Sequence, residues 1–273
     1  MTNRILGALC AAVFLCTAAA SAAQQTAPVA PSKAVCTGSL RNVADRTHAK
    51  INACVAPLHQ LIVQTTYYQN ASKEGGTALA ALPELTLRYG LSDGVELFVD
   101  APSDIAKSGQ RGLGVFYLTH PGYGIKASLA RSARAAYAVS FETRPPLDAM
   151  AHLSLLPQAE LAFTGEWRIT SRWSAQAQAG ALLFRQRGMS GEQRTAAIFS
   201  AAANYDISKR TLLTVQLRSV SSAAMRSSAQ SMGTFGIVQQ LSDRAIFRVE
   251  LGTAFNAAGH TKAHYLGAGF TIR

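Results

Sequence analysis

The feature that most constrains this chain is an alternation of apolar and polar residues, interrupted by connections that are short and long in turn. In the stretch RYGLSDGVELFVD, residues 88–100, apolar side chains occupy every second position on both sides of the turn SDG. This alternation is typical of a β-strand with one apolar face, and a short polar turn between two such segments predicts a hairpin. Short turns of the same kind recur around four later serines: Ser132, Ser171, Ser208 and Ser242.

Twelve alternating segments can be counted, each close to the length of a tilted membrane-crossing strand, about 10 residues. They are 58–69, 82–91, 94–102, 121–131, 134–144, 156–169, 172–184, 195–206, 210–220, 231–241, 244–256 and 263–273. Short turns alternate with longer connections along the whole chain. A solenoid repeat would not produce two kinds of loop in alternation, whereas an up-and-down antiparallel sheet does.

Charged residues fall on one parity of these segments. The opposite parity is apolar and, within the segments, carries no Asp, Glu, Lys or Arg away from strand ends. Two folds would place residues in this way: a soluble β-sandwich or lipocalin-like barrel with its charges outward, and a transmembrane barrel with its charges in the lumen. In the second fold a basic residue facing lipid would cost about 2–4 kcal/mol, which keeps that face apolar.

Two observations favour the transmembrane barrel. Aromatic residues cluster within a few residues of the short turns, as in the aromatic belt at a membrane interface: Tyr89, Trp167, Trp173 and Tyr205. Several positions on the apolar parity are alanines that would fill a soluble core poorly: Ala175, Ala177, Ala179 and Ala181. We therefore predict an all-β fold, an up-and-down antiparallel transmembrane β-barrel of about twelve strands over residues 58–273.

The N-terminus predicts export. A basic residue, Arg4, precedes an apolar stretch and the small-residue sequence ASAAQ, which is the pattern of a cleaved secretory signal peptide over residues 1–23. No later run of about 20 apolar residues could form a transmembrane helix. The expected location is the bacterial outer membrane, with a short periplasmic segment, residues 24–57, ahead of the barrel.

Cys36 and Cys54 are the two cysteines that follow the signal peptide. In an oxidising compartment such a pair predicts a disulfide bond. The residues between them also have weak helical spacing, but a continuous helix would hold the two Cα atoms about 27 Å apart, and a bridge needs about 4–7 Å. We favour the disulfide, which leaves room only for a helix that is short or turns back.

The charged parity predicts a lumen that either conducts small molecules or is filled by paired charges. The candidate lumen residues are Glu84, Arg88, Glu96, Asp100, Lys126, Glu142, Glu166, Arg168, Arg218, Arg248 and Glu250. The net charge of +11 does not indicate nucleic-acid binding in an exported protein. The expected partners are outer-membrane lipid and lipopolysaccharide, the barrel-assembly machinery and a small-molecule cargo, without a cofactor. Nothing in the sequence indicates an oligomeric state.

The stretch PELTLRYGLSDGVELFV, residues 83–99, resembles the signature hairpin of outer-membrane transporter-like proteins grouped with the meta-pathway of phenol degradation. Residues 122–146 and 159–180 are similar to the next two hairpins of that family, so the resemblance extends over about residues 83–273. It implies a small barrel that passes hydrophobic or aromatic compounds, and it supplies no catalytic residue. One departure is the last residue, Arg273, where outer-membrane barrels usually end in an aromatic residue that the assembly machinery reads.

Two other hypotheses remain open. His152 and Ser154 would project on the same side of a strand, as in outer-membrane phospholipase A, with Glu166 as a third group. An apolar pair follows the serine where that enzyme has Asn-Gly, so we expect no enzymatic activity. The histidines show no metal-ligand spacing. A non-transporting structural or loop-binding barrel, with the long connection 102–121 as a lid or binding surface, is the last alternative.

Overall fold

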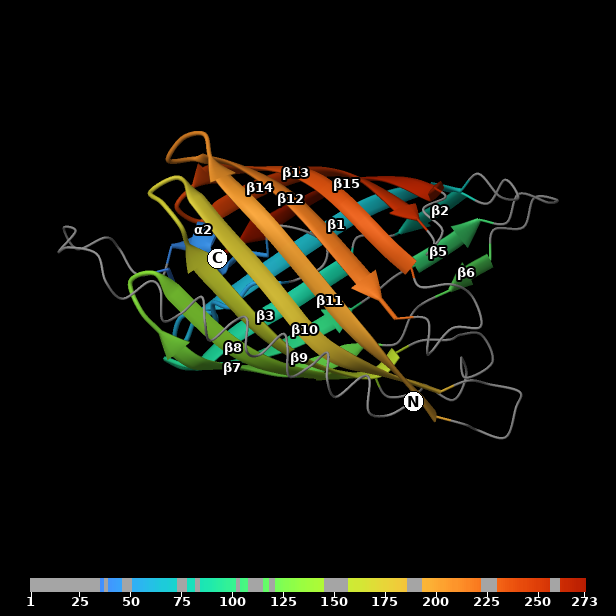
Figure 1. Cartoon of the computed structure of the whole chain (residues 1–273), viewed down its shortest axis with the longest axis horizontal. Helices are drawn as coiled ribbons and strands as arrows, with labels where there is room; N and C mark the ends of the chain where they lie inside the picture. The colour runs from blue at the N-terminus through green and yellow to red at the C-terminus, as the bar shows by residue number, and fades with distance from the viewer. Residues whose placement is uncertain are drawn as a thin grey trace. The chain divides into compact units, whose positions relative to one another are not determined.

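One antiparallel sheet makes up most of the described structure in the computed structural model (Figure 1). The structure describes residues 35–36, 39–45, 51–72, 78–81, 84–101, 104–107, 115–117, 121–144, 157–185, 193–221, 230–255 and 261–273. They belong to a unit that spans Ala34–Arg273, whereas residues 1–33, with the predicted signal peptide, lie outside the described residues. No helix within the described ranges is both long enough and apolar enough to span a membrane.

The sheet closes on itself because β1 pairs with β15. Its segments are β1 (Leu61–Ser72), β2 (Ala78–Ala81), β3 (Glu84–Ser92), β4 (Val95–Ala101), β5 (Asp104–Lys107), β6 (Val115–Tyr117), β7 (Gly122–Arg131), β8 (Ala135–Thr143), β9 (Pro157–Arg168), β10 (Trp173–Arg185), β11 (Gln193–Asp206), β12 (Thr211–Val220), β13 (Gln230–Ser242), β14 (Ala245–Phe255) and β15 (Thr261–Ile272). The pairings between these strands are all antiparallel, and a closed sheet of this kind has no free edge.

These fifteen segments form twelve barrel strands because three strands are interrupted. β1 pairs with β3 as far as Thr66↔Glu84 and then with β2 from Gln69↔Ala80, so β2 and β3 are two parts of one strand. In the same way β5 continues β4, and β6 precedes β7 along the same neighbour. The prediction of a closed up-and-down barrel of twelve strands is confirmed, with strand ends that differ by a few residues.

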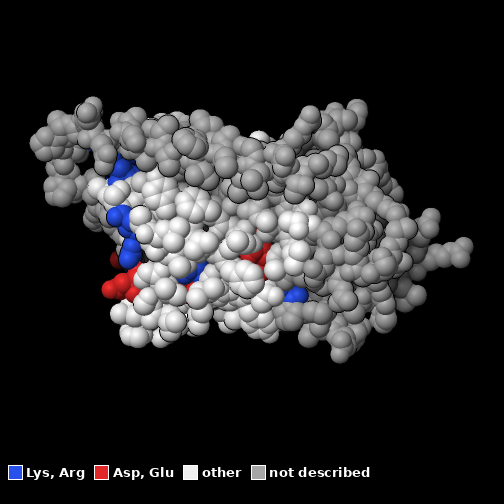
Figure 2. Space-filling view, turned by 60° about the horizontal axis from the view of Figure 1, so that its bottom comes forward, with Lys and Arg blue, Asp and Glu red and all other residues white. Residues whose placement is uncertain are grey.

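The outer face of the barrel carries a belt of exposed apolar side chains. Its members include Leu97, Ile125, Phe141, Leu161, Phe163, Phe199, Val215, Leu217, Phe235, Ile237, Leu251, Leu266 and Phe270. Exposed charged residues lie instead at the short turns: Asp93, Arg131, Arg134, Arg172, Lys209, Arg210, Asp243 and Arg244. On the face shown in Figure 2, most of the coloured atoms of Lys, Arg, Asp and Glu lie at one end, and few are seen on the surface between. A continuous apolar belt of this size is rare on a protein surrounded by water and typical of the lipid-facing band of a barrel.

Aromatic rings border this belt next to the short turns. The rings of Trp173 and Tyr205, on adjacent strands, have centroids 4.8 Å apart. Trp167 Nε1 donates a hydrogen bond to the hydroxyl of Tyr137 at 3.0 Å. Amphipathic rings are favoured where an apolar phase meets water, so these pairs lie where one membrane interface would be.

An arginine placed in the middle of the belt should destabilise the barrel strongly. Val215 lies near the centre of β12, and its side chain is 56% exposed on the outer face. We expect Val215→Arg to lower the free energy of unfolding in lipid vesicles by about 2–4 kcal/mol, measured by urea titration. Val215→Leu, the control, should change it by no more than about 0.5 kcal/mol. Equal stabilities of the two variants would contradict a lipid-facing belt.

The inner face is layered along the barrel axis. Next to the short turns it is apolar, with buried Ile62, Ala136, Ala138, Leu212, Val238 and Ile246. The middle layer is polar and charged. Toward the opposite end, a second buried apolar cluster lies on β9–β11 and consists of Ala162, Leu182, Ala196 and Ile198. A molecule that crossed the lumen would therefore meet apolar, polar and again apolar surroundings.

Candidate functional site

The N-terminal segment fills the lumen at the short-turn end. We call the described residues of 35–56 the insert; it contains a single short helix, α2 (Leu40–Val43). Apolar insert residues such as Leu40 and Val43 are almost fully buried in one cluster with the inward-facing side chains of β1, β8, β12, β13 and β14. A periplasmic segment was predicted for residues 24–57, but its described part lies inside the barrel.

A disulfide bond holds the two ends of the insert together. Cys36 and Cys54 are joined, and their Cα atoms are 5.3 Å apart. The helix between them has only four residues, so the chain can turn back within the loop. Asn52 closes the same loop, because its amide nitrogen donates to the carbonyls of Asn42 at 2.9 Å and Ala44 at 2.8 Å. The insert is therefore a cross-linked loop with its own internal hydrogen bonds.

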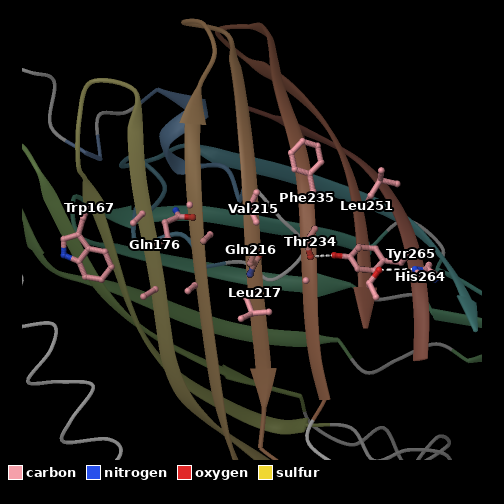
Figure 3. Close-up of a pocket in the computed structure, with 18 residues that line it drawn as sticks. Trp167, Gln176, Val215, Gln216, Leu217, Thr234, Phe235, Leu251, His264 and Tyr265 are labelled. Carbon is pink, nitrogen blue, oxygen red and sulfur yellow. Dashed lines mark hydrogen bonds between the residues drawn. The ribbon is translucent and has the colours of Figure 1, made fainter. Parts of the chain in front are cut away.

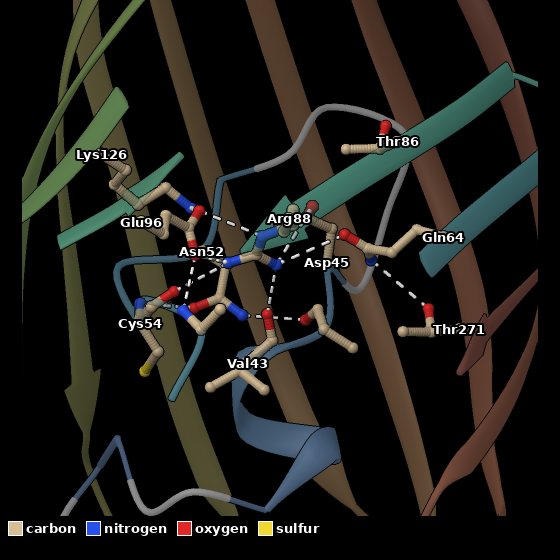
Figure 4. A network of polar contacts seen from close by, with 12 residues as sticks. Val43, Asp45, Asn52, Cys54, Gln64, Thr86, Arg88, Glu96, Lys126 and Thr271 are labelled. Carbon is tan, nitrogen blue, oxygen red and sulfur yellow. Dashed lines mark hydrogen bonds and ion pairs between the residues drawn. The ribbon is translucent and has the colours of Figure 1, made fainter. Parts of the chain in front are cut away.

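Arg88 is the main polar contact between the barrel and the insert (Figure 4). From the inner face of β3 its guanidinium bonds to Glu96 on β4, with Nη2 and Oε2 2.8 Å apart. It also donates to the insert carbonyls of Val43 and of Cys54, the latter at 3.0 Å, and lies 3.6 Å from the carboxylate of Asp45. One buried cation thus holds one wall carboxylate and three groups of the insert.

Glu96 extends this network on its other side. Its carboxylate accepts the backbone N–H of Ala56 at 2.6 Å and lies 3.2 Å from Nζ of Lys126 on β7. Buried charges are tolerated when opposite charges and hydrogen bonds surround them. The cluster therefore depends on the insert, because the insert supplies Asp45, two carbonyls and one N–H.

Arg248 on β14 binds the insert from another part of the wall. Its Nη1 donates to the carbonyl of Asp45 at 2.9 Å, and its Nη2 donates to the hydroxyl of Thr66 on β1. The neighbouring β15 carries Gly269 opposite Arg248, and a Cβ at that glycine would lie 3.0 Å from Nε of the arginine. The small residue leaves the space that the guanidinium occupies.

Glycine also permits the close passage of the chain that leaves the insert. Leu58 forms a parallel bridge with Gly90, and the N–H of His59 donates to the carbonyl of Gly90 at 2.9 Å. A Cβ at Gly90 would lie only 2.0 Å from the carbonyl oxygen of Pro57. Any larger residue at position 90 would push the end of the insert away from β3.

At the rim the insert contacts the β11–β12 turn. Arg41 forms an ion pair with Asp206 and donates to the carbonyl of Lys209 at 2.7 Å. The side chain of Asp206 is 36% exposed. Ion pairs open to solvent contribute little to stability, so this contact is weaker than those of Arg88 and Arg248.

The wall formed by β10–β13 is polar but uncharged in the middle layer. Its inward side chains are Gln176, Gln178, Ser200, Asn204, Thr214, Gln216 and Thr234, and all are buried. Figure 3 shows part of this wall, with Gln176 on β10, Gln216 on β12, Thr234 on β13 and a hydrogen bond between Thr234 and Tyr265. The hollow of about 960 Å³ in the same view is lined mainly by outward-facing residues such as Val215, Leu217 and Phe235, so it lies on the outer face of the barrel. The charged cluster around Arg88 and this uncharged wall thus occupy different strands, with Arg218 on β12 at the edge of the wall.

The predicted lumen residues fall into several groups. Arg88, Glu96 and Lys126 come together as described. Asp100 accepts a hydrogen bond from Thr86 at 2.6 Å and lies 3.8 Å from Arg144, which also binds Glu142 at 2.6 Å. Glu166 accepts from Gln176 at 3.0 Å, and Glu250 shares β14 with Arg248. Arg168 and Arg218 lie on β9 and β12, partly exposed and apart from the Arg88 cluster. The structure does not describe the side chain of Glu84.

The catalytic hypothesis has no geometry to support it. The structure does not describe His152 or Ser154. It describes the connection 102–121 only at Pro121 and in the strand segments Asp104–Lys107 and Val115–Tyr117. Glu166, the proposed third group, is buried in the lumen next to Gln176. Within the described part of the chain, no group of three or more His, Cys, Asp or Glu residues is arranged to hold a metal ion.

Sequence reasoning missed the insert and the uncharged wall. Asp45 and Asn52 stand in a segment that has only weak helical spacing, and no local signal marks them as lumen residues. Asn204 and Gln216 share the parity of the lumen charges, so the alternation alone could have identified them. Their side chains are uncharged, so the charge pattern that marks the other lumen residues does not include them.

Comparisons with known proteins place the fold among outer-membrane barrels. Neither the family models nor the curated proteins contain a match to the sequence. An outer-membrane channel from Pseudomonas putida F1 superposes with a TM-score of 0.60 at 12% identity, over 80% of this chain and 96% of that one. The NanC porin (TM-score 0.53, 10% identity, 78% of this chain and 100% of that one) and the KdgM porin (0.50, 11%, 77% and 98%) are also similar. Such low identities show the fold alone, and the resemblance to the phenol-degradation family stays a prediction.

Proposed function

We propose that this protein is a channel of the bacterial outer membrane that passes small compounds and is closed at rest by its own insert. The observation that carries this proposal is a closed barrel of twelve strands with an apolar outer belt and a polar inner face. A protein with this distribution is stable in lipid and offers a hydrated route only along its axis. Because insert residues contact inward side chains around the barrel, that route is blocked in the described conformation.

The location and partners follow from the same arrangement. The apolar belt would contact the acyl chains of the outer membrane, and the basic short turns would lie among the anionic headgroups of its periplasmic leaflet, with lipopolysaccharide in the opposite leaflet. The protein would be exported with a signal peptide that is then cleaved, and the barrel-assembly machinery would fold it into the outer membrane. The cargo is a small compound, and the link to phenol degradation would make it hydrophobic or aromatic.

Single-channel recording of the refolded mature protein in a planar bilayer tests this function. We expect discrete but infrequent current steps, because the insert must move before ions cross. Heat-modifiable migration on a gel should show in parallel that the barrel has folded. Folded protein that gives no steps at any voltage, and no swelling of liposomes in small solutes, would refute a channel and favour a structural barrel.

A further inference from the structure

The insert is held unequally by the two sides of the lumen. Toward β3, β4 and β14, Arg88 and Arg248 bind it through Asp45 and backbone carbonyls. Toward β11, the described contact in the middle layer is apolar: Ile51 packs against Ala202, and both are buried. Release of an apolar contact of this size breaks no ion pair, so the Ile51 side of the insert is the easier one to displace.

The wall behind Ile51 holds buried polar atoms that have no hydrogen-bond partner among the described residues. They are Oε1 of Gln178, Oγ of Ser200, both amide atoms of Asn204, Oγ1 of Thr214 and both amide atoms of Gln216. A buried polar group without a partner costs about 1–3 kcal/mol. Their hydrogen-bonding capacity is therefore available to a molecule that enters between the insert and this wall.

These groups form one continuous strip. Gln178 lies opposite Ser200, and Asn204 lies opposite Thr214 in the strand register. Gln216 lies opposite Ala202, the residue on which Ile51 packs. The strip thus crosses β10–β12 at the level of the apolar contact. Its own groups are uncharged, and one charged residue borders it: Arg218 on β12, which is partly exposed and lies opposite Ser200.

Both ends of the strip open onto surfaces suited to passage. Toward the long connections it meets the apolar cluster that includes Leu182 and Ile198. Toward the short turns it reaches the rim, where the ion pair of Arg41 and Asp206 is partly exposed and weak. The strongly paired charges of Arg88, Glu96 and Lys126 lie on other strands and would not line this route.

We propose that the route through the barrel runs between the insert and the inner face of β10–β12, and that this wall binds uncharged molecules which combine an apolar body with a hydrogen-bonding group. This inference rests on the proposed channel function and names its substrate class. Amide and hydroxyl groups can both donate to and accept from a neutral ligand. A charged ligand would lose its hydration on the buried strip and find at most one charged group there, the partly exposed Arg218 at its edge.

Ligand block of the channel current tests the binding surface. Benzamide and benzoate have similar size, but only benzamide is uncharged at neutral pH. We expect benzamide to reduce the current of the wild-type channel in a saturable way and benzoate to do so much less. The double variant Asn204→Leu/Gln216→Leu should weaken the benzamide block about 10-fold, because each lost hydrogen bond accounts for several-fold in affinity.

A matched control and a second variant show whether a change in block comes from the strip and not from a folding defect. Thr271→Val removes an inward, buried hydroxyl on β15 and keeps the volume of the side chain. Because Thr271 lies away from the strip, the benzamide block should stay within about twofold of the wild-type value. Ile51→Ala removes the apolar seal itself and should make openings several-fold more frequent. Gel migration before and after heating checks that each variant is folded.

The outcomes of these experiments distinguish a failure of the proposed route from a failure of the channel function. Currents that persist, with benzamide block unchanged in the double variant or with benzoate equally effective, would overturn the proposed route and leave the channel intact. Ile51→Ala openings as rare as in the wild type would also count against it. Absence of current in every folded protein would refute the channel function, and the proposed route with it.

Discussion

Removal of residues 35–55 from the mature protein is expected to raise its mean conductance by about an order of magnitude, because the cross-section of a twelve-stranded barrel would then be open. The insert is buried against inward-facing side chains of at least β1, β3, β4, β8 and β12–β14. Loss of the insert would leave a hydrated lumen lined by Arg88, Glu96 and the uncharged wall. Single-channel recording in planar bilayers measures the change.

A milder variant covers the case in which the deletion prevents folding. Cys36→Ser/Cys54→Ser keeps every other contact of the insert but removes the cross-link, which spans a sequence separation of 18 residues. A disulfide around a loop of this size stabilises the closed conformation by roughly 3 kcal/mol at most, because it lowers the entropy of the displaced chain. We expect openings that are more frequent than in the wild type and fewer than in the deletion. Conductance that stays at the wild-type value in both folded variants would contradict a closing role for the insert.

The barrel could be predicted from the sequence because its determinants are local. A strand in lipid must alternate, so the period of two in residues 84–92 or 245–255 marks both the strand and its lumen side. The pairing of Arg88 with Glu96 also follows, since the two residues flank one short turn. The interrupted strands shift their register by one residue across the gap, from Thr66↔Glu84 to Gln69↔Ala80 for example, but each part follows the same neighbour, so the number of strands is still twelve.

The insert could not be predicted, because its position depends on contacts distant in sequence. Asp45 meets Arg88 and Arg248, which are 43 and 203 residues away, and none of these distances leaves a local pattern. In the sequence, the apolar residues of α2 are equally compatible with a short helix outside the barrel. Only the three-dimensional structure shows that barrel side chains near the short turns are apolar because the insert covers them.

Replacement of Arg88 should have the largest effect of any single substitution in the lumen. Arg88→Met removes the cation that neutralises Glu96 and Asp45 and that binds the carbonyls of Val43 and Cys54. Breaking a buried charge cluster by removing one partner costs about 3–5 kcal/mol, since the remaining charges stay buried. We expect that loss in the free energy of unfolding in lipid vesicles, together with faster proteolysis of the insert.

Two further variants distinguish an anchoring role of Arg88 from a general sensitivity of the lumen. Arg218→Met replaces an arginine on β12 that lies apart from the cluster and is partly exposed, so its cost should be about 0.5 kcal/mol or less. In Arg88→Met/Glu96→Gln the carboxylate left without its arginine is also neutral, and part of the lost stability should return. If Arg88→Met proved no more costly than Arg218→Met, the insert would have to be held mainly by its apolar cluster. The contacts of the insert with Arg88 and Arg248 would then be no stronger than its contact through Ile51. The difference between the two sides of the insert, on which the proposed route depends, would be absent.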